Sequence, residues 1–329
     1  MERTRAIGRG CAGSRPVVHP DRKRHPLTTT ALDSATRLKS EMAAAADAVN
    51  AELDRLLPRP TGHHARVQEA MRYAIQVGGK RMRPFLILQG AKLFGAPEAQ
   101  ALRAAAAIEM VHTYSLVHDD LPCMDDDDLR RGQPTTHKKF DEATAVLAGD
   151  ALLTMAFEVA VGTETHPSAE VRCTLAALLA RASGSEGMVG GQMMDIVAPE
   201  NDFGPDEVAL LQRMKTGALF EFSCEAGPIL GQASDADRAR FRAYAHDLGL
   251  AFQIADDLID ATSTAEKAGK AVGKDAEAGK ATLVSILGVE GARAEALRIA
   301  ARAAEALAPY GPEADVLRAF PRFLVERDA

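Results

Sequence analysis

Helical periodicity is the sequence feature that most limits the folds open to this chain. From about residue 34 onward, Ala, Leu, Met, Glu and Arg are abundant, and apolar residues recur at three- and four-residue intervals. This spacing is the period of an α-helix with one apolar face, and these residue types have high helix propensity. Strand signals are nearly absent from the sequence. We therefore predict an all-α fold.

Short runs rich in glycine and proline separate the predicted helices. None is long enough to be a linker between domains. We predict one helical domain over residues 34–329. Residues 1–33 are rich in Arg, Pro and Gly and are expected to form a disordered tail, with a transit peptide as the alternative interpretation. The runs fall at residues 58–62, 78–79, 95–97, 132–134, 199–205, 231–234 and 269–279.

Composition excludes several classes of function. The net charge of -7 argues against nucleic acid as the main partner, because phosphate backbones attract basic surfaces. The four cysteines form no CxxC pair, which favours a reducing, cytoplasmic location over a disulfide framework. The apolar segment 101–117 is interrupted by Arg103, Glu109 and His112, so we expect no membrane span.

A first acidic cluster, HDDLPCMDDDDLRRG, begins at His118. In an unbroken helix, Asp125 would point about 120° away from Asp119. Pro122 is expected to kink or end the helix, which would bring Asp125 back toward Asp119 and Asp120. Converging carboxylates repel one another unless a hard cation such as Mg²⁺ lies between them. A metal site and a solvated acidic loop both remain open for this segment.

A second acidic cluster, FQIADDLID, begins at Phe252. Asp260 follows Asp256 by four residues and Asp257 by three, and Gln253 lies one turn earlier, so these groups share one side of a helix. Aspartates on an amphipathic surface helix are the alternative. Two such carboxylate sets on separate apolar helices nevertheless favour a metal site over chance.

Cations complete the pattern. In GGKRMRP, residues 78–84, a glycine pair precedes three cations, and Lys80 and Arg83 can share a helix face. Cations at such a position can neutralise phosphate oxygens, although each alone is more commonly a surface charge. The sequence therefore predicts a site in which Mg²⁺ bridges carboxylates to a diphosphate. Further cations near predicted helix ends are Arg130, Arg131, Lys215 and Lys270.

Taken together, these motifs resemble the trans-prenyl transferase (polyprenyl synthase) family, which includes farnesyl and geranylgeranyl diphosphate synthases. The similarity runs from about residue 40 to the end. It implies an orthogonal bundle of mostly antiparallel helices around a deep central cavity, the isoprenoid synthase type, assembled as a homodimer. The motifs that keep the family's order are GGKRMRP, HTYSLVHDDLPCMDDDDLRRGQPTTHKKF, AVLAGDALLTMAFE, GGQMMDI, KTGALFEF and FQIADDLID.

The resemblance also implies roles for individual residues. The ligands of two or three Mg²⁺ ions, or of Mn²⁺ in their place, would be Asp119, Asp120, Asp125, Asp256, Asp257 and Asp260. Isopentenyl diphosphate would be held by Lys80, Arg83, His112 and Arg131. The allylic diphosphate would be held by Arg130, Lys215, Thr216, Gln253 and Lys270. The residues assigned directly to catalysis are Asp119, Asp120, Asp125, Arg130, Lys215 and Asp256.

The implied reaction is ionisation of an allylic diphosphate, attack by isopentenyl diphosphate and loss of a proton. Tyr114, five residues before Asp119, and the adjacent Ser115 would form the floor under the growing chain. A bulky ring at this position is similar to bacterial farnesyl synthases, so farnesyl diphosphate is the predicted product. Geranylgeranyl diphosphate is the alternative, because DDLPCMD also resembles plant-like geranylgeranyl synthases.

Two other classes share part of this pattern. A terpene cyclase would use the first acidic cluster but needs no isopentenyl diphosphate site, so residues 79–84 and the second acidic cluster favour condensation. A non-catalytic subunit of the same fold is the other rival. Both acidic clusters are intact, which favours an active enzyme.

Overall fold

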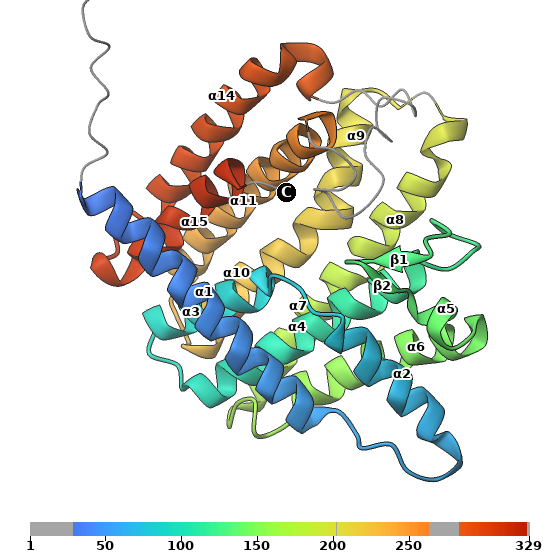
Figure 1. The fold of residues 1–329 in the computed structure, drawn as a ribbon. Helices are drawn as coiled ribbons and strands as arrows, with labels where there is room; N and C mark the ends of the chain where they lie inside the picture. The colour runs from blue at the N-terminus through green and yellow to red at the C-terminus, as the bar shows by residue number, and fades with distance from the viewer. Residues whose placement is uncertain (1–28, 202, 263–282, 328–329) are drawn as a thin grey trace, which may run out of the picture.

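The computed structural model describes residues 29–201, 203–262 and 283–327, and helices make up most of them (Figure 1). The predicted all-α fold class is confirmed. The first helix begins at Thr29, within the predicted tail. The helices are α1 Thr29–Leu56, α2 Ala65–Gln76, α3 Met82–Leu93, α4 Glu98–Asp119, α5 Thr136–Lys139, α6 Glu142–Val161, α7 Ala169–Ser183, α8 Met188–Val197, α9 Pro205–Gln212, α10 Ala218–Leu230, α11 Asp235–Thr262, α14 Leu283–Ala306 and α15 Asp315–Glu326.

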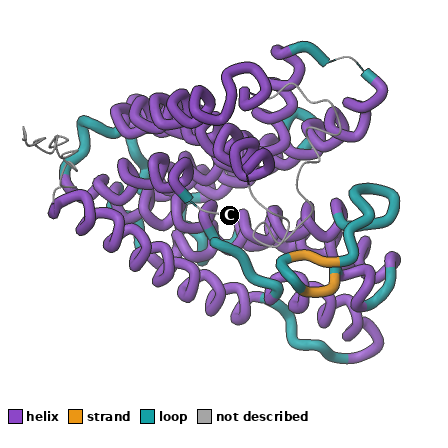
Figure 2. The backbone as a smooth tube through the Cα atoms, turned by 45° about the horizontal axis from the view of Figure 1, so that its top comes forward, coloured by secondary structure: helices purple, strands orange, loops and turns teal. Residues whose placement is uncertain are grey.

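Short elements join these helices. In the described chain, a hairpin pairs β1, Leu129–Arg130, antiparallel with β2, Gln133–Pro134, and Figure 2 shows these strands in orange among helices and loops. A π-helical turn, η3, spans Arg213–Gly217 and runs directly into α10. The short 3-10 turns are η1 Gly62–His64, η2 Ala198–Glu200 and η4 Pro312–Ala314.

Helices α4 and α10 occupy the centre of the bundle. Helix α4 packs against α3 and α6, and α10 packs against α3, α7 and α11. Both are buried on more than one face, as their nearly continuous apolar sequences predict. Gly227 of α10 allows this packing, because a Cβ there would lie 2.4 Å from the backbone nitrogen of Ala91 in α3.

A second core region joins the two ends of the described chain. It packs residues of α1, α3, α10, α11 and α15 into one apolar cluster. The rings of Phe85 and Phe320 lie 5.2 Å apart, and the Tyr244 hydroxyl donates to the Leu317 carbonyl at 2.8 Å. Figure 1 shows α15 beside α1 and α11. This packing fixes the position of α15 and of the residue that follows it, Arg327.

Helix α6 departs from one expectation. By length and composition alone it could cross a membrane, whereas no segment of the sequence was expected to do so. In the structure it packs against α2, α4 and α7, as a core helix does. Core helices of soluble proteins meet the same criterion, so α6 is weak support for a membrane span.

Candidate active site

The first acidic cluster folds back at the end of α4. The helix ends at Asp119, and the backbone N–H of Asp125 donates to the Asp119 carbonyl at 2.9 Å. Pro122 lies in the turn between them, where a residue without an N–H removes no helical hydrogen bond. The expected return of Asp125 toward Asp119 is therefore confirmed. The turn places the three carboxylates predicted as metal ligands at one end of a central helix.

Two of these carboxylates are partly withdrawn from water. Burial raises the pKa of Asp119 to about 6; the positive charge of Lys215 opposes this rise and the carboxylate of Asp125 adds to it. Burial also raises the pKa of Asp120, although the Arg130 guanidinium opposes the change. The Arg130 Nε–H donates to Asp120 Oδ1 at 2.6 Å. Negative charge is therefore costly here, and a bound cation would stabilise it.

The glycine-rich motif before α3 separates its three cations. Arg81 adopts a left-handed backbone, φ 46°, and turns into the core, where it pairs with Glu109. It also donates to Asn50 Oδ1 at 2.9 Å and to the Ile75 carbonyl at 2.8 Å. Lys80 and Arg83 remain beside the candidate site. The motif thus supplies one structural arginine and two cations for binding.

Arg83 is held in an unusual environment. Its guanidinium lies 4.7 Å from the centre of the Phe220 ring, and its Nε is buried without a hydrogen-bond partner among the described residues. Burial lowers the pKa of Arg83 to about 10, against the opposing charges of Glu109 and Asp256. The side chain still carries its charge at neutral pH. A buried donor of this kind is suited to an anionic ligand.

Lys80 and Arg131 surround the same position. A Cβ on Gly79 would lie 2.7 Å from Arg131 Nη1, so glycine is needed for this close approach. The pKa values of Lys80 and Arg131 are both lowered, first by burial, with neighbouring arginines adding to the effect. His112 lies within the same field, and burial, then Arg83, hold its pKa well below the usual range. Its imidazole is therefore neutral and can donate one N–H.

The second acidic cluster faces these cations from α11. Asp256 lies close enough to Lys80 and Arg83 for its negative charge to oppose the lowering of both pKa values by burial. Asp257 is buried at 8% exposure, and Asp260 is half-buried. The Gln253 Oε1 is buried without a hydrogen-bond partner in the described part of the chain. The structure thus brings the second cluster to the cations predicted from residues 78–84.

Lys215 connects the first cluster to α8. It lies in the π-helical turn η3, and its Nζ donates to Asp195 Oδ2 at 2.6 Å. Gly191 of α8 permits this contact, because a Cβ there would lie 2.2 Å from the Lys215 backbone nitrogen. Thr216 is half-buried in the same turn. π-Helical turns are frequent at functional sites, where they redirect a side chain out of the regular helix pattern.

Sequence reasoning missed two residues in this region. Arg327, directly after α15, pairs with Asp256, and its guanidinium lies 4.5 Å from the centre of the Phe252 ring. Its Nη1 is buried and has no hydrogen-bond partner among residues that the structure describes. Asp195 is the other, through its contact with Lys215. Its place in GGQMMDI was a signal for Asp195, whereas nothing near Arg327 in the sequence indicated a role.

Lys270, which was predicted to bind the allylic diphosphate, lies outside the described residues. Asp120, Arg130 and Arg131 line a pocket, together with apolar residues of α2 and α4. A larger groove between α1, α3 and the start of α4 contains none of the predicted site residues.

Comparison with known proteins supports the same assignment. A family model described as polyprenyl synthetase matches residues 64–308. The chain belongs to the polyprenyl synthetase family. It is therefore a trans-prenyl transferase that acts on isoprenoid diphosphates. The family is known for the use of divalent metals, and all-oxygen sets such as Asp119, Asp120 and Asp125 fit that chemistry.

Individual members of the polyprenyl synthetase family are similar over most of the chain. The chloroplastic geranylgeranyl pyrophosphate synthase of Catharanthus roseus is 42% identical over 298 residues, 90% of this chain and 83% of that protein. Farnesyl diphosphate synthase of Bacillus subtilis is 45% identical over 228 residues, 69% of this chain and 77% of that protein. The apo crystal structure of an FPP/GFPP synthase from Zymomonas mobilis superposes with a TM-score of 0.80 at 46% identity, over 88% of this chain and 99% of that one.

The residues predicted to set product length lie on α4, about one helical turn before the first acidic cluster. Tyr114 is 6% exposed, and its ring meets the His118 ring edge-on at 5.7 Å. Burial raises the pKa of its hydroxyl to about 12, and the carboxylate of Asp119 adds to the rise. Ser115 donates to the His112 carbonyl at 2.9 Å, which ties its hydroxyl to its own helix. Of the two, Tyr114 offers the larger rigid obstacle.

Proposed function

We propose that this trans-prenyl transferase condenses isopentenyl diphosphate with dimethylallyl and geranyl diphosphate, and that farnesyl diphosphate is its main product. The observation that carries the proposal is the crowding of cations at Lys80, Arg83 and Arg131. Each has a lowered pKa, which means that its environment disfavours its charge. Binding a diphosphate would relieve that cost, because the anion would supply the missing counter-charge.

The two acidic clusters would hold the metal. We assign two or three Mg²⁺ ions, or Mn²⁺ in their place, to the carboxylates of both clusters. When bound, the ions would supply positive charge that stabilises the departing diphosphate. The ligands in this proposal are Asp119, Asp120 and Asp125 on α4 and its turn, and Asp256, Asp257 and Asp260 on α11.

The chain's own residues would orient the two substrates. Lys80, Arg83, His112 and Arg131 would bind isopentenyl diphosphate, with His112 acting as a neutral donor. The allylic diphosphate would be bound by Arg130, Lys215, Thr216, Gln253 and Lys270. The allylic carbon–oxygen bond would break with release of diphosphate, a carbon–carbon bond would form to the isopentenyl double bond, and the released diphosphate would accept the proton that is lost. Apolar walls would keep water from the allylic cation.

Product length rests on Tyr114. Its buried ring lies five residues before Asp119, the position that the family resemblance assigns to the floor of the chain-binding cavity. The similarity to the farnesyl diphosphate synthase of Bacillus subtilis agrees with a C15 product. A C20 product is the second candidate, because the relatives named geranylgeranyl pyrophosphate synthases match up to 91% of the chain.

Product sizing tests both candidates. The full chain would be incubated with labelled isopentenyl diphosphate, Mg²⁺ and each of dimethylallyl, geranyl and farnesyl diphosphate. We expect C15 to accumulate from the first two primers and little extension of the third. Accumulation of C20 from all three would replace the farnesyl assignment. Turnover of an allylic diphosphate without isopentenyl diphosphate would indicate a cyclase, and no turnover a non-catalytic chain.

Tyr114→Ala is expected to lengthen the product from C15 to C20 or beyond. Removing the ring opens space below the growing chain, and apolar burial of about 0.8 kcal/mol per methylene favours filling it. Chromatography of the dephosphorylated products would measure the shift. Tyr114→Phe is the matched control, since it keeps the ring and should retain C15. Unchanged C15 output from Tyr114→Ala would contradict the role of this residue.

We also propose that the chain forms a homodimer through α6. Val146, Leu147 and Val161 are exposed at 39, 57 and 47%, which leaves apolar side chains uncovered by the described residues near both ends of this helix, with exposed Asp150, Thr154 and Glu158 between them. Light scattering should give the mass of two 35.0 kDa chains. Leu147→Glu should shift the population toward one chain, whereas Asp47→Asn on α1 should not. A monomeric wild-type chain would overturn the proposal.

Cytoplasmic location remains our proposal. Cys123 and Cys173 are exposed thiols and Cys224 is buried, with no disulfide among the described cysteines. Free thiols agree with a reducing compartment. Several relatives are named as chloroplastic, and residues 1–28, where a transit peptide would lie, are outside the described chain.

A further inference from the structure

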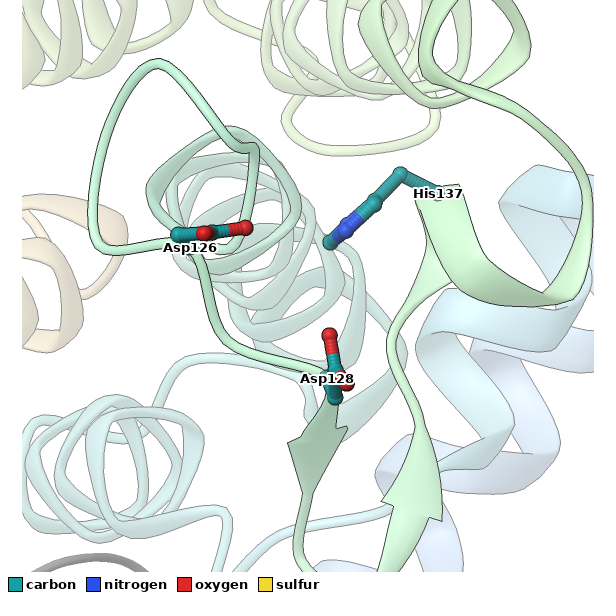
Figure 3. A group of neighbouring side chains, drawn as sticks. All are labelled: Asp126, Asp128 and His137. Atoms are coloured by element: carbon teal, nitrogen blue, oxygen red, sulfur yellow. The ribbon is translucent and has the colours of Figure 1, made fainter.

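A second cluster of candidate metal ligands lies beside the first acidic cluster and is not used by the proposed reaction. It consists of Asp126, Asp128 and His137, whose ligand atoms lie within 4.8 Å of one another. Asp126 and Asp128 come from the turn before β1, and His137 lies in the first turn of α5. Figure 3 shows the His137 ring projecting toward the space between the two carboxylates.

The His137 ring presents a buried nitrogen to this space. The side chain is only 7% exposed, yet its Nε2 has no hydrogen-bond partner within the described chain. An unsatisfied buried polar atom is uncommon, because burial removes its hydrogen bonds to water without replacing them. The two carboxylates beside it are exposed, so they can turn toward a ligand without loss of packing. The unpaired nitrogen therefore indicates that a ligand binds on the side of Asp126 and Asp128.

Thr135 fixes the form of the imidazole. Its hydroxyl donates to the Asp127 carbonyl at 2.8 Å and lies 3.1 Å from His137 Nδ1. A hydroxyl has one proton, so donation to the carbonyl leaves its oxygen to accept from Nδ1–H. The lone pair of the neutral ring then lies on Nε2. A histidine that binds a metal is oriented by a hydrogen bond of this kind on its other nitrogen.

The surrounding backbone holds the cluster in place. The Thr135 N–H donates to the Asp128 carbonyl at 3.0 Å, which continues the β1–β2 pairing and brings Asp128 beside the start of α5. The Asp126 N–H donates to the Leu121 carbonyl at 3.1 Å, and its left-handed φ of 50° turns the chain at this point. The three ligands are thus presented by a closed loop.

We propose that Asp126, Asp128 and His137 bind one divalent transition-metal ion, with Zn²⁺ as the representative case, separately from the Mg²⁺ of the reaction. Imidazole nitrogen favours ions such as Zn²⁺, whereas the all-carboxylate clusters favour Mg²⁺. Ligands about 2.0 Å from a tetrahedral ion lie about 3.3 Å apart, so the carboxylates must move inward by about an ångström. Water would complete the coordination.

Lys138 competes with the ion for Asp128. Its Nζ lies 2.8 Å from Asp128 Oδ1, and its side chain is 44% exposed. An incoming ion would displace this ammonium group or use the second carboxylate oxygen. Removing the ammonium should therefore strengthen binding, because Asp128 would no longer have a competing cation. A metal site should bind its ion more tightly without the Lys138 ammonium, whereas a cluster that only needs a neighbouring positive charge would be less stable without it.

Metal binding would act on the loop that carries Asp125. The ion would join the turn at Asp126 and Asp128 to the first turn of α5. The turn at Asp126 and Asp128 directly follows Asp125, a proposed Mg²⁺ ligand. The bound ion would restrict the motion of this turn, since its ends would be cross-linked. The inference does not depend on the proposed reaction, because it is tested by binding alone.

The test is Zn²⁺ affinity of the full chain, measured by chelator competition in excess Mg²⁺ that fills the all-oxygen sites. We expect one Zn²⁺ per chain. Asp126→Asn, Asp128→Asn and His137→Gln should each weaken binding by about tenfold or more, as loss of a supporting contact alone commonly does. Lys138→Met should strengthen it. Asp127→Asn, which removes the same charge from the same loop, and His246→Gln, which removes an exposed histidine of α11, should leave it unchanged.

Three results would overturn the inference. The first is no Zn²⁺ binding by the wild-type chain. The second is wild-type affinity in both aspartate variants, which are exposed positions and should fold even if His137→Gln does not. The third is equal weakening by Asp127→Asn, since the effect would then be general electrostatics and not ligation. Circular dichroism without Zn²⁺ would confirm that each variant is folded.

Discussion

Asp119→Asn is expected to lower kcat/KM for condensation by about a thousandfold, which corresponds to about 4 kcal/mol of transition-state stabilisation. The reason is the position of Asp119 at the end of α4. Its carboxylate is partly buried and lies in the field of Asp125 and Asp120, so its charge is best stabilised by a bound cation. The amide keeps the shape of the side chain but removes the charge. Release of labelled product at varied Mg²⁺ would measure the effect.

Two controls accompany this prediction. Asp47→Asn makes the same chemical change at an exposed position of α1 and should leave kcat/KM unchanged. Thermal unfolding of Asp119→Asn should be close to the wild type, because the raised pKa shows that the charged carboxylate is disfavoured at this position. A loss of activity smaller than about tenfold would contradict the assignment of Asp119 as a metal ligand.

Glu109→Ala is expected to lower the free energy of unfolding by about 3–5 kcal/mol, because it leaves the guanidinium of Arg81 buried without its counter-charge. The side chains of Arg81 and Glu109 are 2% and 3% exposed. The contacts of Arg81 with Asn50 and the Ile75 carbonyl remain, but both are neutral acceptors. Urea denaturation followed by circular dichroism would measure the change.

The double variant Arg81→Met with Glu109→Leu tests the physical reason. Removing both charges replaces a buried ion pair by apolar groups, which is commonly neutral or stabilising. We therefore expect the double variant to recover most of the stability that Glu109→Ala loses. If Glu109→Ala lowers the unfolding free energy by less than about 1 kcal/mol, the pair does not fix the start of α3. The activity of Glu109→Ala should fall together with its stability, because Lys80 and Arg83, which are proposed to bind substrate, flank Arg81.

The first acidic cluster illustrates how far local sequence reaches. Pro122 predicted a kink or an end of α4, and the structure ends the helix at Asp119 with Asp125 folded back onto it. Proline restricts the backbone in any context, so this inference needs no knowledge of the rest of the chain. The same holds for the shared face of Asp256 and Asp260, which follows from helix geometry.

The motif GGKRMRP shows where local sequence is insufficient. Lys80, Arg81 and Arg83 have similar chemistry, and helix spacing alone does not assign one of them to the core. Arg81 is buried because Glu109, 28 residues later, supplies a counter-charge on α4. Arg83 remains at the site because Phe220, on α10, provides a ring beneath its guanidinium. Both partners are brought near by packing between helices.

Arg327 gave no signal in the sequence, for the same physical reason. It follows Asp256 by 71 residues, and it reaches α11 because α15 packs against α1 and α11 through aromatic side chains. Likewise, the pairing of Lys215 with Asp195 depends on Gly191, which allows α8 to approach the π-helical turn. Contacts of this kind depend on long-range packing, which no local pattern encodes.

The amino-acid pattern therefore predicted the helical class, the end of α4 and the family, which are confirmed, and it predicted the two carboxylate sets as metal ligands. These properties follow from backbone geometry and residue chemistry within one or two helical turns. Folding in three dimensions assigned Arg81 to the core, Arg327 to Asp256 and the buried nitrogen of His137 to the space beside Asp126 and Asp128. Each of those contacts joins separate elements, so it exists only once the helices and the hairpin have packed together.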